Sequence, residues 1–118
     1  VELAGLPIPD DLEGTSMVPV IADPGGSWKR GVFSQFPRPW MYNGEPEVMG
    51  YSVRTPDFRY TEWRNLRSGL LEGCELYHYK IHDIEHRNLA GVPDYRAVQL
   101  AMKQLLDGGW KHALPGDR

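Results

Sequence analysis

Four segments of the chain alternate apolar and polar residues with the period of a half-buried strand. They are rich in β-branched and aromatic side chains, and we expect strands at residues 28–36, 48–55, 58–64 and 75–80. Proline cannot donate to a sheet ladder, so FPRPW at residues 36–40 is expected to end the first strand. Short turns or loops separate the strands, which favours antiparallel pairing.

The last apolar pattern has a helical period and predicts a helix over residues 94–107. Its apolar positions are Tyr95, Val98, Met102 and Leu105. Asp94 is the expected N-cap, and Gly108-Gly109 is the expected stop. Together these elements predict an α+β fold with about four antiparallel strands and a C-terminal helix packed on one face.

Three regions follow from this pattern. Residues 1–27 contain four prolines and read as an irregular lead-in with one helical turn at residues 17–21, capped by Thr15 or Ser16. Residues 28–110 form the sheet-and-helix domain, and residues 111–118 are a tail. No internal repeat or low-complexity tract is present.

The central hairpin has a turn at Thr55-Pro56-Asp57-Phe58. The simplest register places Arg54 opposite Arg59 and Val53 opposite Tyr60. The face with Val53 and Tyr60 is then expected to meet the core. Two arginines directly opposite one another are destabilising unless an anion lies between them, and Glu62 is one expected source of that countercharge.

Composition limits the function classes. The chain has 118 residues, 41% hydrophobic and 25% charged, which is typical of one soluble globular domain. No apolar run is long enough to span a bilayer, and no secretory signal is present. One cysteine, Cys74, excludes an internal disulfide framework. Because the sequence starts at Val1 without a methionine, we expect a processed protein or a piece of a longer one.

Charge is unevenly distributed along a chain with a net charge of −3. Residues 29–67 hold seven bases and four acids, which suits an anionic ligand. Aromatic residues alternate with arginines at residues 58–64, as in binders of single-stranded nucleic acid. Nucleic-acid-binding domains are usually strongly basic, so we expect no nucleic acid partner.

Three histidines, His78, His82 and His86, recur every four residues. On a helix they would line one face like zinc ligands. Aromatic and β-branched neighbours favour a strand followed by a turn, where such spacing spreads the rings apart. We therefore expect surface histidines and no metal site.

Several segments resemble sulfatases, and they occur in the order found in that family. GYSVRTPDFRYTEW at residues 50–63 and Glu75-Leu76-Tyr77 followed by Asp83, Glu85 and Asn88-Leu89-Ala90 are similar to family segments. SQFPRP at residues 34–39 resembles the iduronate-2-sulfatase-like branch. Leu6-Pro7 with LEGTSMVPVI at residues 12–21 resembles the stretch before this region. His78 and Ile84 depart from the family, which usually has Asp and Pro there.

The resemblance implies the C-terminal subdomain of a larger enzyme that hydrolyses sulfate esters, such as iduronate 2-sulfate or related polysaccharide units. That parent is expected to use calcium and a formylglycine made in a C/S-x-P-x-R motif, and to be exported. The motif is absent here, since Cys74 is followed by Glu-Leu-Tyr-His. We therefore expect no catalytic residue and no sulfatase activity in the chain alone. Its expected partners are the N-terminal catalytic domain and a sulfated carbohydrate.

Three residues are candidates for substrate binding. Arg38 and Trp40 lie on a proline-braced segment, where an arginine suits a sulfate or carboxylate and an aromatic ring suits a sugar face. Arg54 is the third candidate. For Arg54 and Arg59 the alternative is a structural ion pair, with Glu62 or with an acid of the missing catalytic domain. The alternative function is a free-standing binding or scaffold module for an anionic ligand.

Overall fold

The computed structural model describes residues 1–12, 14–40, 43–80 and 84–115. The chain divides into two compact units, one of Val1–Lys29 with Leu114–Arg118 and one of Arg30–Ala113. The second unit contains the expected sheet and helix, and the first contains the lead-in.

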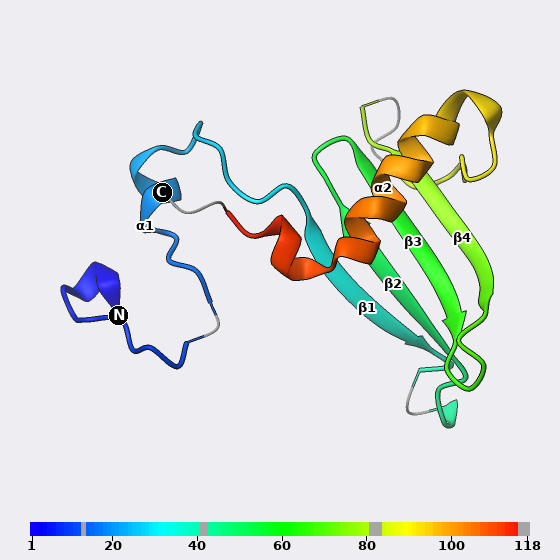
Figure 1. Cartoon of the computed structure of the whole chain (residues 1–118), viewed down its shortest axis with the longest axis horizontal. Helices are drawn as coiled ribbons and strands as arrows, with labels where there is room; N and C mark the ends of the chain where they lie inside the picture. Colours follow the sequence, from blue (N-terminus) through cyan, green and yellow to red (C-terminus); the bar gives the residue numbers. More distant parts are fainter. Residues whose placement is uncertain (13, 41–42, 81–83, 116–118) are drawn as a thin grey trace. The chain divides into compact units, whose positions relative to one another are not determined.

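The second unit is a four-stranded antiparallel sheet in the order β1-β2-β3-β4 (Figure 1). The strands are β1 (Val32–Arg38), β2 (Val48–Arg54), β3 (Phe58–Asn65) and β4 (Leu71–His78). The helix α2 (Arg96–Gly108) lies across one face of the sheet, between the 3₁₀ turns η3 (Pro93–Tyr95) and η4 (Trp110–Ala113). The α+β prediction is confirmed.

The predicted hairpin register is also confirmed. Arg54 is paired with Arg59, Val53 with Tyr60 and Tyr51 with Glu62. Residues two apart on a strand share a face, so this register sends Val53 and Tyr60 toward α2. They form the core with Leu76, Leu89 and Met102.

Element boundaries differ from the sequence expectation where neighbouring strands decide them. β1 starts at Val32 instead of residue 28 and continues through Pro37 to Arg38. Proline is tolerated because β1 is an edge strand, where a missing N–H costs no ladder bond. β4 begins at Leu71 because it pairs with the end of β3, and it stops at His78.

Both predicted helix starts need correction as well. Asp94 lies inside η3, and α2 has Tyr95 at its N-cap without a side-chain capping bond. The early helix α1 covers Val18–Ala22, one residue later than expected, with Met17 at the N-cap. Thr15 and Ser16 are the two residues expected to cap this turn. Ser16 bonds to its first residue, since the Ser16 Oγ accepts a hydrogen bond from the Val18 N–H at 3.1 Å.

The outer edge of β4 is closed by the segment that follows it. The Asn88 Oδ1 accepts the Leu76 N–H at 2.9 Å, and the Asn88 Nδ2 donates to the Cys74 carbonyl at 3.1 Å. The Leu89 N–H then donates to the Leu76 carbonyl at 2.8 Å. Because these bonds satisfy backbone groups that an edge strand leaves open, they also place Leu89 in the core.

A buried carboxylate lies on the helix side of the sheet. Glu62 is 1% exposed and accepts bonds from the Tyr60 hydroxyl and from Arg64 Nε, both at 2.9 Å. Lys103 of α2 adds a second cation 3.6 Å away. A buried charge is tolerated when it is paired and hydrogen-bonded, so this cluster ties α2 to β3.

Burial, followed by the Glu62 carboxylate, raises the pKa of the Tyr60 hydroxyl above its ordinary value of 10. Stability linked to a raised pKa is fully present below the unfolded pKa and is lost as pH rises above it. We expect the free energy of unfolding to fall more steeply between about pH 9 and about pH 11 in the wild-type chain than in Tyr60→Phe. Urea unfolding at both pH values measures this, with Tyr51→Phe, an exposed ring, as the control. Equal slopes in wild type and Tyr60→Phe contradict it.

Candidate functional site

The sheet has a second face, on the side opposite α2, which we call the open face. Since Val53, Tyr60 and Leu76 point toward α2, the residues next to them point the other way. Applied to the pairing of the strands, this places the following residues on the open face: Val32, Ser34, Phe36, Arg38, Val48, Gly50, Ser52, Arg54, Arg59, Thr61, Trp63, Gly73, Glu75 and Tyr77. The two basic candidates, Arg38 and Arg54, lie on it.

Side chains from different strands are joined at one end of this face. The Arg38 guanidinium lies 3.5 Å from the centroid of the Trp63 ring, a cation–π contact. Trp63 Nε1 donates to Glu75 Oε1 at 2.8 Å, and the Tyr77 hydroxyl donates to Glu75 Oε2 at 3.2 Å. Burial, followed by Glu75, raises the pKa of Tyr77. The indole is therefore fixed in position by a cation on its face and an anion at its edge.

Gly50 is the reason that the indole can lie flat on the sheet. A Cβ at this position would lie 2.6 to 2.9 Å from three atoms of the Trp63 ring. Real Cβ atoms do not approach other atoms so closely, so the glycine is required by the ring above it. Gly73, the partner of Trp63 on the other neighbouring strand, has no atom within 4 Å of such a Cβ.

At the other end of the open face, Arg54 and Arg59 lie opposite one another, and each has its own partner. The Arg59 Nη1 lies 3.0 Å from Glu85 Oε1, and the Tyr79 hydroxyl donates to the same carboxylate. The Arg54 guanidinium lies 3.7 Å from the centroid of the Tyr79 ring. Glu85 is therefore the countercharge of Arg59, whereas Arg54 lies against the Tyr79 ring. The suggested Glu62 is wrong, because alternation puts it on the helix side.

Burial, followed by Glu85, raises the pKa of Tyr79. The phenol therefore stays protonated as the donor to Glu85 while its ring carries Arg54. Within the part of the chain that the structure describes, Arg59 Nε is shut off from solvent and has no hydrogen-bond partner.

A small hollow of about 50 Å³ lies between the two ends. Its floor includes Ser52 and Thr61, which are 6% and 3% exposed. Thr61 Oγ1 donates to Ser52 Oγ at 2.9 Å, and Ser52 Oγ donates to the Tyr60 carbonyl at 3.3 Å. Pockets for small molecules usually measure about 300 to 1,000 Å³, so this hollow is too small for a sugar ring.

The structure brings together two of the three predicted substrate residues. Trp40, two residues after Arg38, is 39% exposed and stacks on Phe36 with ring centroids 5.0 Å apart. Arg38 is paired with one end of β2, at Val48, and Arg54 forms the other end. Six residues of strand separate the backbones of these ends by about 20 Å, so Arg54 lies too far away to share one sulfate group with Arg38.

Sequence reasoning did not identify Trp63, Tyr79 and Glu85 as the partners of these arginines. Strand alternation alone places Trp63 and Arg59 on one face. It gives no information on side chains beyond the end of β4, such as Tyr79 and Glu85.

The described ranges contain no group of three or more His, Cys, Asp or Glu side chains arranged to hold a metal ion. His78 stacks on Phe58 at 4.2 Å, and His86 Nδ1 lies 3.2 Å from the Ile84 carbonyl. His82 falls outside the described residues. The half-buried Cys74 accepts a bond from Gln99 Nε2 at 3.7 Å. The described side chains therefore provide no cluster of ligands for a calcium ion.

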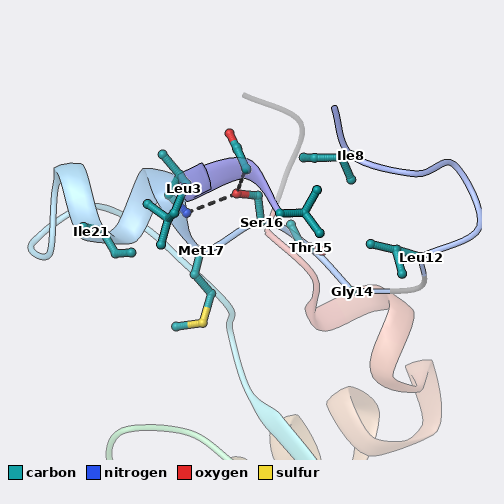
Figure 2. Close-up of a pocket in the computed structure, with 11 residues that line it drawn as sticks. Leu3, Ile8, Leu12, Gly14, Thr15, Ser16, Met17 and Ile21 are labelled. Atoms are coloured by element: carbon teal, nitrogen blue, oxygen red, sulfur yellow. Dashed lines mark hydrogen bonds between the residues drawn. The ribbon is translucent and has the colours of Figure 1, made fainter. Parts of the chain in front are cut away.

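The lead-in unit has a hollow of its own, of about 340 Å³ (Figure 2). Leu3, Ile8, Leu12 and Met17 line it, and Figure 2 shows Ser16 joined by hydrogen bonds to Glu2 and to the Val18 N–H. None of the described residues of 1–29 is buried. The lining is mainly apolar, and its hydroxyl–carboxylate pair, Ser16 with Glu2, is exposed to solvent, so its volume alone does not indicate a catalytic site.

No helix among the described residues is long and apolar enough to cross a membrane. No family model matches the chain. Similarity to individual proteins is clear nonetheless. The chain is 27% identical over 111 residues to the N-acetylglucosamine-6-O-sulfatase of Bacteroides thetaiotaomicron, and the match covers 91% of this chain and 19% of the relative.

Solved structures show the same relationship. A crystal structure of a candidate sulfatase from Bacteroides thetaiotaomicron has a TM-score of 0.71 and 27% identity, covering 95% of this chain and 23% of that one. A protein solved in complex with its substrate D-glucosamine-2-N,6-O-disulfate has a TM-score of 0.71 and 25% identity, covering 95% of this chain and 22% of that one. The chain thus spans about a fifth of the length of the sulfatases to which it is similar.

The Gly50 contact gives a direct test of the open face. We expect Gly50→Ala to lower the free energy of unfolding by about 1 to 3 kcal/mol, because the methyl group displaces the Trp63 ring. Gly73→Ala is the matched control and is expected to change stability by less than about 0.5 kcal/mol. Urea unfolding of the chain measures both. Equal effects of the two substitutions would show that the indole does not rest on Gly50.

Proposed function

We propose that the chain is the C-terminal subdomain of a sulfatase, an enzyme that hydrolyses sulfate esters of sugars. The observation that carries this proposal is the match of nearly the whole chain, 91% of it, to 19% of an N-acetylglucosamine-6-O-sulfatase. The sulfatase-like segments noted in the sequence support it. In the structure they build the core, the Gly50–Trp63 contact and the Asn88 closure of β4.

The chemical step belongs to another part of that enzyme. No C/S-x-P-x-R motif is present in these 118 residues, and Cys74 is half-buried and followed by Glu75. Calcium and formylglycine are therefore proposed for the preceding catalytic domain. A cation there would offset the charge that develops on the sulfuryl oxygens. The chain described here completes the fold and forms part of the substrate cleft.

Amino-sugar 6-sulfates are the substrates that we propose first. One relative is named for N-acetylglucosamine 6-O-sulfate, and one structural neighbour was solved with a glucosamine 6-O-sulfate. Iduronate 2-sulfate, suggested by the SQFPRP segment, is the second candidate. The two differ in the position of the sulfate and in the carboxylate of the uronic acid, so a direct comparison separates them.

Arg38 and Trp40 are the proposed substrate contacts at the cleft rim. The Trp63 ring holds the Arg38 guanidinium in a fixed plane, which leaves its N–H groups to form paired bonds with a sulfate. Trp40, stacked on Phe36, places an aromatic ring close to it in sequence. Arg54 lies at the other end of β2 and cannot contact the same sulfate group as Arg38.

A free-standing module that binds an anionic ligand is the second candidate function. The observation that favours it is the pair of cation–π contacts, Arg38 on Trp63 and Arg54 on Tyr79, which orient two guanidinium groups on one face. Such a module would bind a sulfated oligosaccharide as the isolated chain, with an affinity that falls as salt rises.

Sulfatase activity is expected in the full-length parent and not in the isolated chain. The purified 118-residue chain is expected to release no sulfate from an aryl sulfate above a buffer blank, whereas the full-length parent protein turns it over. The parent is expected to prefer glucosamine 6-sulfate to iduronate 2-sulfate in kcat/KM. Turnover by the isolated chain contradicts the proposal, and the opposite preference selects the second substrate.

A second functional prediction concerns Arg38. In the full-length parent, we expect Arg38→Ala to lower kcat/KM by about 10- to 100-fold, the range for losing a hydrogen bond to a charged group. Arg67→Ala, in the exposed turn between β3 and β4, is the control and is expected to leave kcat/KM unchanged. Circular dichroism confirms that both variants fold. Unchanged kcat/KM in folded Arg38→Ala removes this residue from the substrate site.

A further inference from the structure

We infer that the preceding part of the parent chain packs on the open face, and that the Arg54 end of this face receives a carboxylate from that part. Arg38, the last residue of the edge strand β1, lies at the border of this interface, where it faces the substrate cleft. This inference rests on the proposed function, because it needs a longer parent chain. It adds which face is the interface and which chemistry the partner surface carries.

The two faces of the sheet differ in how well their apolar side chains are covered. On the helix side, Val53, Tyr60 and Leu76 are at most 2% exposed beneath α2. On the open face, Val32 and Phe36 of the edge strand are 64% and 51% exposed. Large apolar groups on a sheet face next to fully buried hydroxyls at Ser52 and Thr61 are typical of a surface that another layer covers.

Charge on the open face is unbalanced among the described residues. Glu75 is bonded to Trp63 and Tyr77, and Glu85 is shared by Arg59 and Tyr79. The Arg54 guanidinium contacts the Tyr79 ring, and no carboxylate of the described ranges is paired with it. A guanidinium whose flat side lies on an aromatic ring keeps its N–H edge available for a carboxylate. The complementary surface therefore carries an Asp or Glu at this end.

The size of the face fits an interface between domains. Strands about 4.8 Å apart and rising about 3.3 Å per residue give a four-stranded face of roughly 400 Å². Covering it buries roughly 800 Å² in total, within the usual 600 to 1,500 Å² for domains of one chain. The hollow of about 50 Å³ admits one side-chain tip and is too small for a sugar.

The preceding polypeptide is the occupant that the observations favour. About four-fifths of the similar sulfatases lies outside the match, since the match covers 19% of one and 23% of another. A second copy of this chain is disfavoured, because a symmetric pair would bring two faces with excess positive charge together.

Hydroxyl-radical footprinting with peptide mass spectrometry tests the inference on natural residues. Phe36 on the open face and Leu100 on α2 are similarly exposed, at 51% and 57%. Each is compared in the isolated chain and in the full-length parent. We expect the labelling rate of Phe36 to fall at least about 5-fold in the parent while that of Leu100 stays within about 2-fold, because burial removes the solvent contact that labelling needs. An unchanged rate at Phe36 overturns the inference, whatever Leu100 does.

A variant pair tests the carboxylate. In the parent, Arg54→Ala is expected to restore at least half of the Phe36 labelling seen in the isolated chain, whereas Arg67→Ala leaves Phe36 protected. Arg54→Lys, which keeps the charge, is expected to retain most of the protection. Full protection in folded Arg54→Ala overturns the role of this residue.

Sulfate release measured on the same parent preparation separates this inference from the proposed function. Turnover with Phe36 unprotected leaves the proposed function standing and overturns the inference. Protection of Phe36 without turnover of any sulfate ester supports the interface and contradicts the proposed function. A native polypeptide of only these 118 residues contradicts both.

Discussion

Burial of Val53, Tyr60 and Leu76 beneath α2 is the contact on which the rest of this structure depends. Each fully buried side chain of this kind stabilises the fold by about 1.5 to 3 kcal/mol. A slip of one residue in any strand would move its apolar set to the opposite face. The core therefore fixes the register, and the register in turn sends Arg38, Arg54, Arg59 and Trp63 to the open face. The packing of the core on the helix side of the sheet therefore determines which side chains form the candidate site on the open face.

The two sides of the sheet use different interactions. The helix side is closed by apolar packing and by one buried carboxylate, Glu62, that joins β3 to α2. The open face is held by contacts between rings, guanidinium groups and carboxylates, each of which is worth less than a buried apolar side chain when exposed to water. Such contacts gain strength when a further layer excludes solvent. A subdomain packed against a larger domain would supply that condition.

The core and the central hairpin could be predicted from the sequence because both depend on local signals. The simplest register around the turn at Thr55-Pro56-Asp57-Phe58 is the one that the structure has. The path of β1 through Pro37 could not be predicted, since it depends on β1 being an edge strand. The partners of the arginines were missed for a related reason. Glu85 reaches Arg59 from a segment without periodicity, and Asn88 closes β4 through its side chain. Gly50 and Trp63 lie 13 positions apart in sequence, and only strand pairing brings them together.

The reading frame upstream of Val1 tests the central claim, that this sheet and helix form the final subdomain of a sulfatase. We expect that frame to continue for several hundred codons, in line with relatives of which this chain covers about a fifth, and to encode a C/S-x-P-x-R motif with acidic calcium ligands. A start codon immediately before Val1, or a long upstream region without that motif, would contradict the account.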